Sequence, residues 1–244
     1  MNYEVCIIIP CYNEAARFDV TRFWEYYEQL PEVDFVFVND GSTDGTADIL
    51  DEIALAKMNI HTLHLDQNMG KGNAVRAGLL WALQHTEASC FGYFDADFAT
   101  PLTEALALQQ HLEQHPKAFL VLGSRQAHNG TRIKRHWYRH IPGRVFATLV
   151  NWFVLNHTIY DTQCGAKLMS RQCVEDFCQT AFTTRWLFDI ELIMRIASQY
   201  PKSELKKRIL EISISQWIDY GESKIRFIDW LVIPFELLGL VFKK

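Results

Sequence analysis

The chain has 244 residues, of which 49% are apolar and 22% are charged, so it can bury a sizeable core. Its length suits one large α/β domain, and no internal repeat or low-complexity linker interrupts it. The net charge of −5 argues against a protein whose whole surface binds nucleic acid, so any anion site must be local. The six cysteines form no CxxC pair and no zinc-like spacing, and no basic region precedes the first apolar run. We therefore expect reduced thiols, no secretory signal and a cytoplasmic protein.

Short apolar runs alternate with longer helical patterns over the first half of the chain. This order builds a parallel sheet through right-handed crossovers. The expected strands are residues 5–9, 35–38, 60–65, 91–94 and 119–122. The expected helices are residues 15–30, 46–58, 73–85 and 101–114, the last with Thr100 as N-cap and Pro101 at the first helical position. The pattern predicts an α/β fold with a central, mostly parallel sheet flanked by helices.

The alternation ends near residue 124. A polar, basic loop comes next, followed by an apolar stretch at 145–155 and a strand at 166–169. We expect two further helices, at 172–181 and 188–200, and one alternating strand at 212–217. All of these segments are assigned to a single domain, residues 1–224.

The last residues, 225–244, are expected to form a C-terminal amphipathic helix. The segment is largely apolar, but three charged residues interrupt it and Pro234 splits it. A membrane-spanning helix needs about 20 predominantly apolar residues, so this segment does not span a bilayer by itself. Its aromatic residues and its two terminal lysines suit a helix that lies in a membrane interface. A helix packed on its own core or on a second subunit is the alternative.

Two acidic residues, Asp95 and Asp97, follow directly after the expected strand at 91–94. Alternate residues of extended backbone project to the same side, so the two carboxylates should converge at the carboxyl edge of the sheet. Mg²⁺ or Mn²⁺ would fit there, completed by water and a diphosphate. Open α/β sheets bind ligands beyond this edge, which favours a metal site over two solvated acids.

Two other strand ends place polar residues at the same edge. The first strand runs into the segment PCYNE at 10–14, and the second runs into NDGSTDG at 39–45. Their acidic residues can accept hydrogen bonds from a ribose or a base edge. Neither the dinucleotide-binding GxGxxG spacing nor the P-loop spacing is present. In the third crossover loop, at 68–72, Lys71 either meets a nucleotide or belongs to a plain turn before a helix.

Positive charge is concentrated between residues 114 and 160, a range without any acidic residue. The basic residues there are Lys117, Arg125, Arg132, Lys134, Arg135, Arg139 and Arg144. Guanidinium groups suit phosphate oxygens, so this segment could bind a second phosphate near a metal-bound diphosphate. A solvated basic loop and a patch for anionic lipid or RNA are the alternatives.

Asp189 begins a helical pattern in the segment WLFDIE at 186–191. We interpret it first as an N-cap or first-turn acid. A catalytic or sugar-holding role is the alternative.

Six motifs occur in the order found in family 2 glycosyltransferases. They are IPCYNE at 9–14, NDGSTD at 39–44, NMGKG at 68–72, DAD at 95–97, GSR at 123–125 and DTQCGAK at 161–167. More narrowly, the chain resembles the dolichyl-phosphate β-glucosyltransferases, with the polyprenyl-phosphate mannosyltransferases close by. The motif at 161–167, the segment at 185–189 and GESK at 221–224 favour the glucosyl branch. The resemblance covers nearly the whole chain, and the ordered set is far more specific than any single motif.

The resemblance implies a GT-A fold, a nucleotide-sugar donor, Mg²⁺ or Mn²⁺, and a lipid-phosphate acceptor. The donor-binding residues that it implies are Pro10, Tyr12, Glu14, Asp40, Lys71 and Asp95, with Asp95 and Asp97 holding the diphosphate through the metal. The residues that it implies at the acceptor phosphate are Arg125, Arg135 and Arg139. Asn39 stands where the family often has an aspartate. Many relatives carry membrane-spanning segments that are not found here, so lipid access is expected through the terminal helix and the basic segment.

The leading hypothesis is therefore an inverting glycosyltransferase that moves glucose from UDP-glucose to a polyprenyl or dolichyl phosphate. It would be peripheral on the cytoplasmic membrane face. A lipid phosphate with a second pKa of about 6 is mostly dianionic at neutral pH and needs no general base, whereas a hydroxyl acceptor would need one, with Asp189 as the candidate. The alternatives are mannose transfer from GDP-mannose, sugar transfer to a saccharide hydroxyl, and a nucleotide- or lipid-binding protein without turnover.

Overall fold

The computed structural model describes residues 4–126, 132–134, 159–218, 236–237, 239–240 and 242. The first half alternates strands with helices: β1 (Val5–Cys11), α1 (Val20–Tyr27), β2 (Asp34–Asn39), α2 (Thr46–Leu55), β3 (Ile60–His64), α3 (Lys71–His85), β4 (Cys90–Phe94), α4 (Glu104–Gln114) and β5 (Leu120–Ser124). The second half contains β6 (Arg132–Lys134), β7 (Ala166–Ser170), α6 (Arg171–Phe177), α7 (Phe188–Gln199), α8 (Lys202–Arg208), β8 (Ile209–Ser213) and β9 (Gln216–Ile218).

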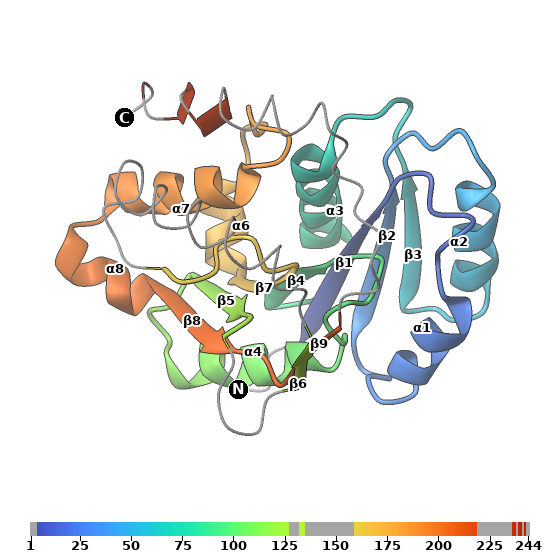
Figure 1. The fold of residues 1–244 in the computed structure, drawn as a ribbon, viewed down its shortest axis with the longest axis horizontal. Helices are drawn as coiled ribbons and strands as arrows, with labels where there is room; N and C mark the ends of the chain where they lie inside the picture. The colour runs from blue at the N-terminus through green and yellow to red at the C-terminus, as the bar shows by residue number, and fades with distance from the viewer. Residues whose placement is uncertain are drawn as a thin grey trace.

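Seven strands form one sheet in the order β3-β2-β1-β4-β7-β5-β8, with β3 and β8 at its two edges (Figure 1). Neighbouring strands pair in parallel, except that β7 runs antiparallel to both β4 and β5. Strands β6 and β9 pair separately as a small parallel sheet. The α/β fold with a mostly parallel sheet is therefore confirmed.

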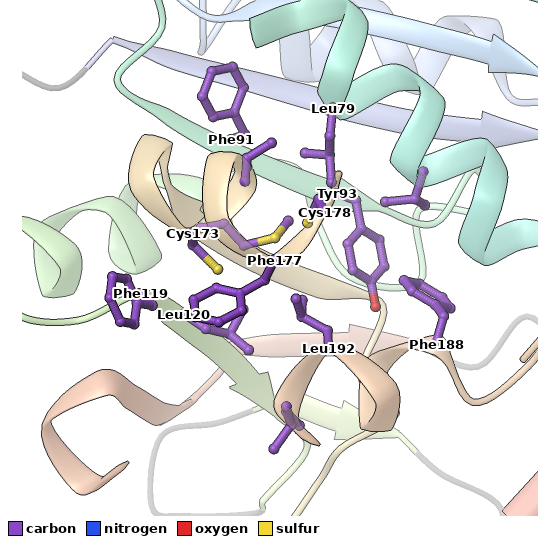
Figure 2. Close-up of a cluster of buried hydrophobic side chains, with 14 of the residues drawn as sticks. Leu79, Phe91, Tyr93, Phe119, Leu120, Cys173, Phe177, Cys178, Phe188 and Leu192 are labelled. Carbon is purple, nitrogen blue, oxygen red and sulfur yellow. The ribbon is translucent and has the colours of Figure 1, made fainter. Parts of the chain in front are cut away.

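Side chains of the central strands enter two cores, one on each face of the sheet. In β1, Cys6 and Ile8 join the core beneath α3, α6 and α7, whereas Ile7 and Ile9 join the core beneath α1, α2 and α4. Alternation of side chains along a strand produces this division, and burial on both faces explains why β1 is almost continuously apolar. Figure 2 shows part of the first core, in which Phe177 of α6 lies near Leu120 of β5 and near Phe119, the residue before this strand.

Two helices begin later than the sequence predicts. Helix α1 begins at Val20, where the Asp19 carboxylate accepts the Arg22 N–H at 3.0 Å. The preceding residues are excluded from the helix because the Ala15 N–H donates to Asp44 in the loop after β2 and to Thr46, the first residue of α2. Helix α4 begins at Glu104, so the predicted cap at Thr100 and first turn at Pro101 are wrong. The Glu104 N–H donates to the Pro101 carbonyl at 3.1 Å, which makes these residues a separate turn.

Three differences occur in the second half. The single strand expected at 212–217 is two strands, β8 and β9, in different sheets. The break lies at Ser215, whose N–H donates to the Glu104 carboxylate at 3.0 Å. The helix expected at 172–181 ends at Phe177, and beyond it Arg76 of α3 binds the Cys178 carbonyl at 2.9 Å. Helix α8 and the short strand β6 were not expected.

The described residues of the C-terminal segment contact the domain itself. Leu240 is buried in the core beneath α3 and α7, and Leu237 packs against that core, whereas Phe242 is exposed. Residues 225–235 of the expected terminal helix lie outside the described residues, as does the apolar stretch at 145–155. Within the part of the chain that the structure describes, no helix is long and apolar enough to cross a membrane. All six cysteines lie in the described part of the chain, where they are buried and form no disulfide.

Candidate functional site at the carboxyl edge of the sheet

The loops after β1 and β2 are joined at the carboxyl edge of the sheet. The N–H of Asn13 donates to Ser42 Oγ at 2.9 Å, and the N–H of Thr43 donates to Asn13 Oδ1 at 2.8 Å. The Glu14 N–H donates to Thr46 Oγ1 at 2.8 Å. Parallel strands end at the same edge, so the predicted nucleoside-binding residues of both loops lie side by side. These residues are Pro10, Tyr12, Glu14 and Asp40, of which Pro10 and Tyr12 are partly exposed.

Asp40 is buried and fixes the third crossover loop. Its Oδ1 accepts the Met69 N–H at 2.6 Å, and its Oδ2 accepts the Gly70 N–H at 3.0 Å. Burial raises the pKa of the Asp40 carboxyl, and these two hydrogen bonds oppose that rise. The structure thus gives Asp40 a role in holding the loop that carries Lys71, which sequence reasoning did not foresee.

Lys71, the first residue of α3, pairs with Asp95. Its ammonium lies 2.5 Å from Asp95 Oδ1 and 5.5 Å from the centre of the Tyr93 ring. A cation at a helix N-terminus opposes the helix dipole, so the placement requires compensation. Desolvation alone would lower the pKa of Lys71, but the carboxylates of Asp95 and Asp189 outweigh it and the pKa is raised. Lys71 therefore belongs to a charged cluster at the sheet edge, and its contact with a nucleotide stays a prediction.

Asp97 stands beside Asp95 and accepts the Ala99 N–H on Oδ1 at 3.0 Å. Desolvation at the sheet edge and the negative charge of Asp95 raise the pKa of the Asp97 carboxyl. A divalent cation would relieve this repulsion, and oxygen donors suit Mg²⁺ and Mn²⁺. Among the described residues, no group of three or more potential metal ligands occurs. The carboxylate oxygens of Asp95 and Asp97 fit a metal that takes two protein ligands and completes its shell with water and ligand oxygens.

Gly165, in the loop before β7, lies directly against Asp95. The Asp95 N–H donates to the Gly165 carbonyl at 3.2 Å. A Cβ at residue 165 would lie 2.0 Å from Asp95 Oδ2, so only glycine fits without displacing the carboxylate. Sequence reasoning included this glycine in a motif but assigned it no role.

Arg125 follows β5 and is bound by Asp161. Its Nε lies 2.6 Å from Asp161 Oδ2, its Nη2 lies 2.7 Å from Oδ1, and its guanidinium lies over the Trp217 ring. Burial would raise the pKa of Asp161, but the Arg125 charge outweighs it and lowers the pKa to about 2. Glu211 of β8 accepts the backbone N–H groups of Tyr160 and Asp161 at 2.8 and 2.7 Å. Arg125 is thus held in a fixed orientation close enough to Asp95 for their charges to interact.

Among the residues that the structure describes, three buried polar atoms next in sequence to this ion pair have no hydrogen-bond partner. They are Ser124 Oγ, Thr162 Oγ1 and Gln163 Nε2. A buried donor without a partner costs about 1–3 kcal/mol, so such groups usually meet a ligand or an ordered water. The predicted acceptor residues Arg135 and Arg139 lie outside the described residues.

Asp189 lies in the first turn of α7, as one of the two structural interpretations predicts, while Leu187 occupies the N-cap. Its Oδ1 accepts the hydroxyl of Tyr93 and lies 3.1 Å from the ammonium of Lys167. Lys167 is fully buried and also donates to the Tyr93 hydroxyl at 2.9 Å and to the Cys164 carbonyl at 2.6 Å. Sequence reasoning missed this cluster, although a lysine inside the otherwise apolar run of β7 signals it.

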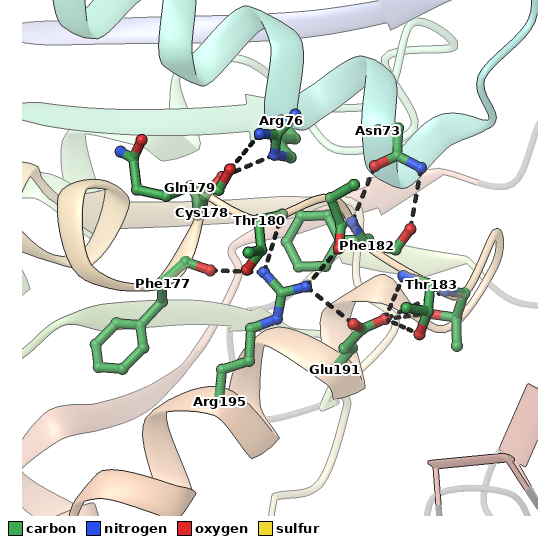
Figure 3. A network of polar contacts seen from close by, with 12 residues as sticks. Asn73, Arg76, Phe177, Cys178, Gln179, Thr180, Phe182, Thr183, Glu191 and Arg195 are labelled. Atoms are coloured by element: carbon green, nitrogen blue, oxygen red, sulfur yellow. Dashed lines mark hydrogen bonds and ion pairs between the residues drawn. The ribbon is translucent and has the colours of Figure 1, made fainter. Parts of the chain in front are cut away.

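A polar network fixes the start of α7 against α3 (Figure 3). Asn73 of α3 accepts the Phe182 N–H at 2.9 Å and donates to the Phe182 carbonyl at 3.1 Å. Glu191 of α7 accepts the N–H groups of Thr183 and Thr184, and Arg195 binds carbonyl oxygens of the same loop. The network keeps the ends of α3 and α7 that carry Lys71 and Asp189 in a fixed relation.

The C-terminal segment reaches the same region. Glu236 accepts the N–H groups of Arg185 and Trp186 at 2.8 and 3.2 Å. The guanidinium of Arg185 in turn contacts the side-chain oxygen of Asn68, the first residue of the loop that Asp40 holds. A residue near the end of the chain is therefore linked to the third crossover loop.

Residues 6–177 match the family described as Glycosyl transferase family 2, and this match covers more than half of the chain. The chain belongs to that family. A dolichyl-phosphate beta-glucosyltransferase of Trichomonas vaginalis is 32% identical to this glycosyltransferase over 97% of the chain and 72% of that protein. The human dolichyl-phosphate beta-glucosyltransferase is 28% identical over 96% of the chain and 74% of its own length.

Solved structures place the glycosyltransferase in the GT-A fold. The glucosyl-3-phosphoglycerate synthase of Mycobacterium tuberculosis, in complex with Mn²⁺, UDP-glucose and phosphoglyceric acid, superposes with a TM-score of 0.70. The two chains are 15% identical, and the match covers 99% of this chain and 79% of the other. At this identity the likeness shows only a shared fold. The GT-A fold implied by the family motifs is thus confirmed.

Proposed function

We propose that this glycosyltransferase transfers glucose from UDP-glucose to a polyprenyl or dolichyl phosphate and inverts the anomeric centre, giving a β-linked product. The observation that carries the proposal is that Asp95, two residues before Asp97, is close enough to Arg125 at the sheet edge for their charges to interact. The two acids suit a metal-bound diphosphate, and the guanidinium suits a second phosphate. Together they allow two anionic reactants, the nucleotide sugar and the lipid phosphate, to bind side by side. The names of relatives that match nearly the whole chain support the same substrates.

The donor side of the site uses the acidic edge. Asp95 and Asp97 would hold Mg²⁺ or Mn²⁺, which when bound would neutralise charge on the departing nucleoside diphosphate. Lys71 lies against Asp95 and adds a fixed positive charge close to where that diphosphate would bind. The loops after β1 and β2 would line the nucleoside through Pro10, Tyr12, Glu14 and Asp40.

The acceptor side uses Arg125, with Arg135 and Arg139 proposed as its partners from the sequence motif. Asp161 orients the Arg125 guanidinium, and the unpartnered polar atoms around it offer donors or acceptors to a phosphate. A phosphate dianion needs no general base. Asp189 is poorly placed to act as one, because its Oδ1 already accepts from Tyr93 and faces the Lys167 ammonium.

The C-terminal segment, residues 225–244, is proposed to bring the domain of residues 1–224 to the cytoplasmic face of a membrane. Leu237 and Leu240 anchor the end of this segment on the domain, and exposed Phe242 leaves an aromatic side chain for a bilayer. Without such membrane contact, the long acceptor lipid would have to leave its bilayer to reach the site.

The experiment that tests the function pairs two donors with two acceptors. UDP-glucose and GDP-mannose are each incubated with Mn²⁺ and either a polyprenyl phosphate in vesicles or a free saccharide. We expect transfer only from UDP-glucose to the lipid phosphate. Transfer from GDP-mannose would replace the proposed donor, transfer to the saccharide would replace the acceptor, and no transfer in any pair would contradict the enzymatic proposal.

A further inference from the structure

Lys167 is a charged side chain with no exposed surface in the centre of the sheet. It sits on β7 directly opposite Tyr93 of β4 in the antiparallel register. Its ammonium has three partners, the Tyr93 hydroxyl, the Cys164 carbonyl and the Asp189 carboxylate. Because an ammonium has three N–H donors, these three partners can accept all of its hydrogen bonds.

Stability does not explain this arrangement well. Burying two charges costs several kcal/mol of desolvation each, and a buried ion pair is often no more stabilising than apolar residues of the same shape. The neighbours of the group are apolar: the Tyr93 ring packs against Phe188, 5.3 Å away between centroids. Three apolar side chains would fill the same space, so the presence of Lys167, Asp189 and the Tyr93 hydroxyl there needs an explanation other than stability.

Two routes lead from Lys167 to Asp95. In the first, Lys167 holds the Cys164 carbonyl, and the next residue, Gly165, lies against the Asp95 carboxylate and binds its backbone N–H. In the second, Lys167 and Asp189 bind the hydroxyl of Tyr93, which precedes Asp95 by two residues on β4. Lys167 therefore contacts both segments that support the Asp95 carboxylate, which are strand β4 and the loop before β7.

We propose that Lys167 is a positioning residue, which with Asp189 and Tyr93 holds Asp95 where a metal-bound nucleoside diphosphate requires it. The group acts from behind the sheet edge and touches neither reactant. The identity of the ligand rests on the proposed function, but the positioning role does not depend on which sugar or acceptor is used.

Three variants test the role. Lys167→Met removes the charge and leaves Asp189 buried without its cation, which we expect to lower Tm. Asp189→Asn keeps the shape and removes the counter-charge. The triple variant Lys167→Met, Asp189→Leu, Tyr93→Phe replaces the polar group by apolar side chains, and we expect it to recover much of the lost Tm. Lys206→Met, at an exposed lysine of α8, is the control.

The readouts are Tm and the Kd for a nucleoside diphosphate in the presence of Mn²⁺, measured by calorimetry with UDP and with GDP in parallel. We expect each of the three variants to weaken binding by at least tenfold, including the triple variant at recovered Tm, while the control binds as wild type. If binding recovers together with Tm in the triple variant, or if folded Asp189→Asn binds as wild type, Lys167 only supports folding and the proposal is overturned. If the proposed donor or acceptor is wrong, the wild-type enzyme itself would prefer GDP or fail in the transfer assay. That result is distinct from a loss of binding confined to the variants.

Discussion

Arg125 and Asp161 form a buried ion pair whose charges depend on each other. The Asp161 carboxyl has a pKa of about 2 in the folded protein, below its ordinary value of 3.8. A group with a lowered pKa in the folded state stabilises the protein above its unfolded pKa, and this stabilisation is lost as the pH falls toward the folded pKa. Acid should therefore weaken the support that holds Arg125 in place.

This argument predicts the pH dependence of unfolding. The free energy of unfolding contributed by Asp161 should fall by about 1 kcal/mol between pH 5 and pH 3 and should be constant above pH 5. Urea unfolding of the wild type and of Asp161→Asn at several pH values measures it, because other carboxyls affect both proteins equally. The two stability curves should converge as the pH falls, and parallel curves would contradict the assigned pKa.

Gly165 provides a test that involves no charge change. Gly165→Ala would place a Cβ within 2.0 Å of Asp95 Oδ2 and must displace that carboxylate. We expect the variant to fold and its Kd for Mn²⁺ and nucleotide to rise by more than tenfold. Gly239→Ala is the control, since no atom of the described residues lies within 4 Å of a Cβ there. Unchanged binding in Gly165→Ala would mean that the position of Asp95 does not matter.

Sequence reasoning found the residues that project from strand ends and missed those that support them. Asp95 and Asp97 were predictable because an acidic pair after an apolar strand has a known place in an α/β sheet. Asp161 and Lys167 were not assigned, because their roles depend on Arg125 and Asp189, which are distant from them in sequence. The positions of Arg135 and Arg139 stay predictions.

The strands were predicted more accurately than the helix ends. Every strand of the first half begins and ends within two residues of its expected bounds. In β1, β2 and β4, burial on both faces leaves a nearly continuous apolar signal, whereas the edge strand β3 is only partly buried. Helix boundaries moved because long-range hydrogen bonds compete with helical ones, as Asp44 and Thr46 do for Ala15. The break between β8 and β9 has the same kind of cause, since Glu104 binds Ser215.

The C-terminal segment should influence donor binding through Glu236. Glu236→Ala removes the acceptor of the Arg185 and Trp186 N–H groups and should loosen Arg185 from Asn68. We expect the KM for the nucleotide sugar to rise three- to tenfold, with a much smaller change in kcat. Steady-state kinetics compare it with Glu52→Ala, which removes an exposed glutamate of α2. An equal effect in both variants would show that Glu236 does not act on the donor loop.

At the scale of the whole molecule, the fold places both halves of the site at one edge. The parallel strands β1, β2, β4 and β5 all end there, so the topology alone brings the acidic and basic groups together. The mostly parallel sheet was predictable from the alternation of elements. The antiparallel direction of β7 was not, because an apolar run does not record the direction of a buried strand.

The central claim is that this edge binds a nucleotide sugar through a divalent cation held by Asp95 and Asp97. Calorimetric titration of UDP-glucose into the wild type, Asp97→Ala and the exposed-site control Asp48→Ala, each with Mn²⁺ and with EDTA, tests it most directly. We expect Mn²⁺-dependent binding in the wild type and the control, and at least tenfold weaker binding in Asp97→Ala. Equal affinity in all three proteins, or affinity that EDTA leaves unchanged, would contradict the claim.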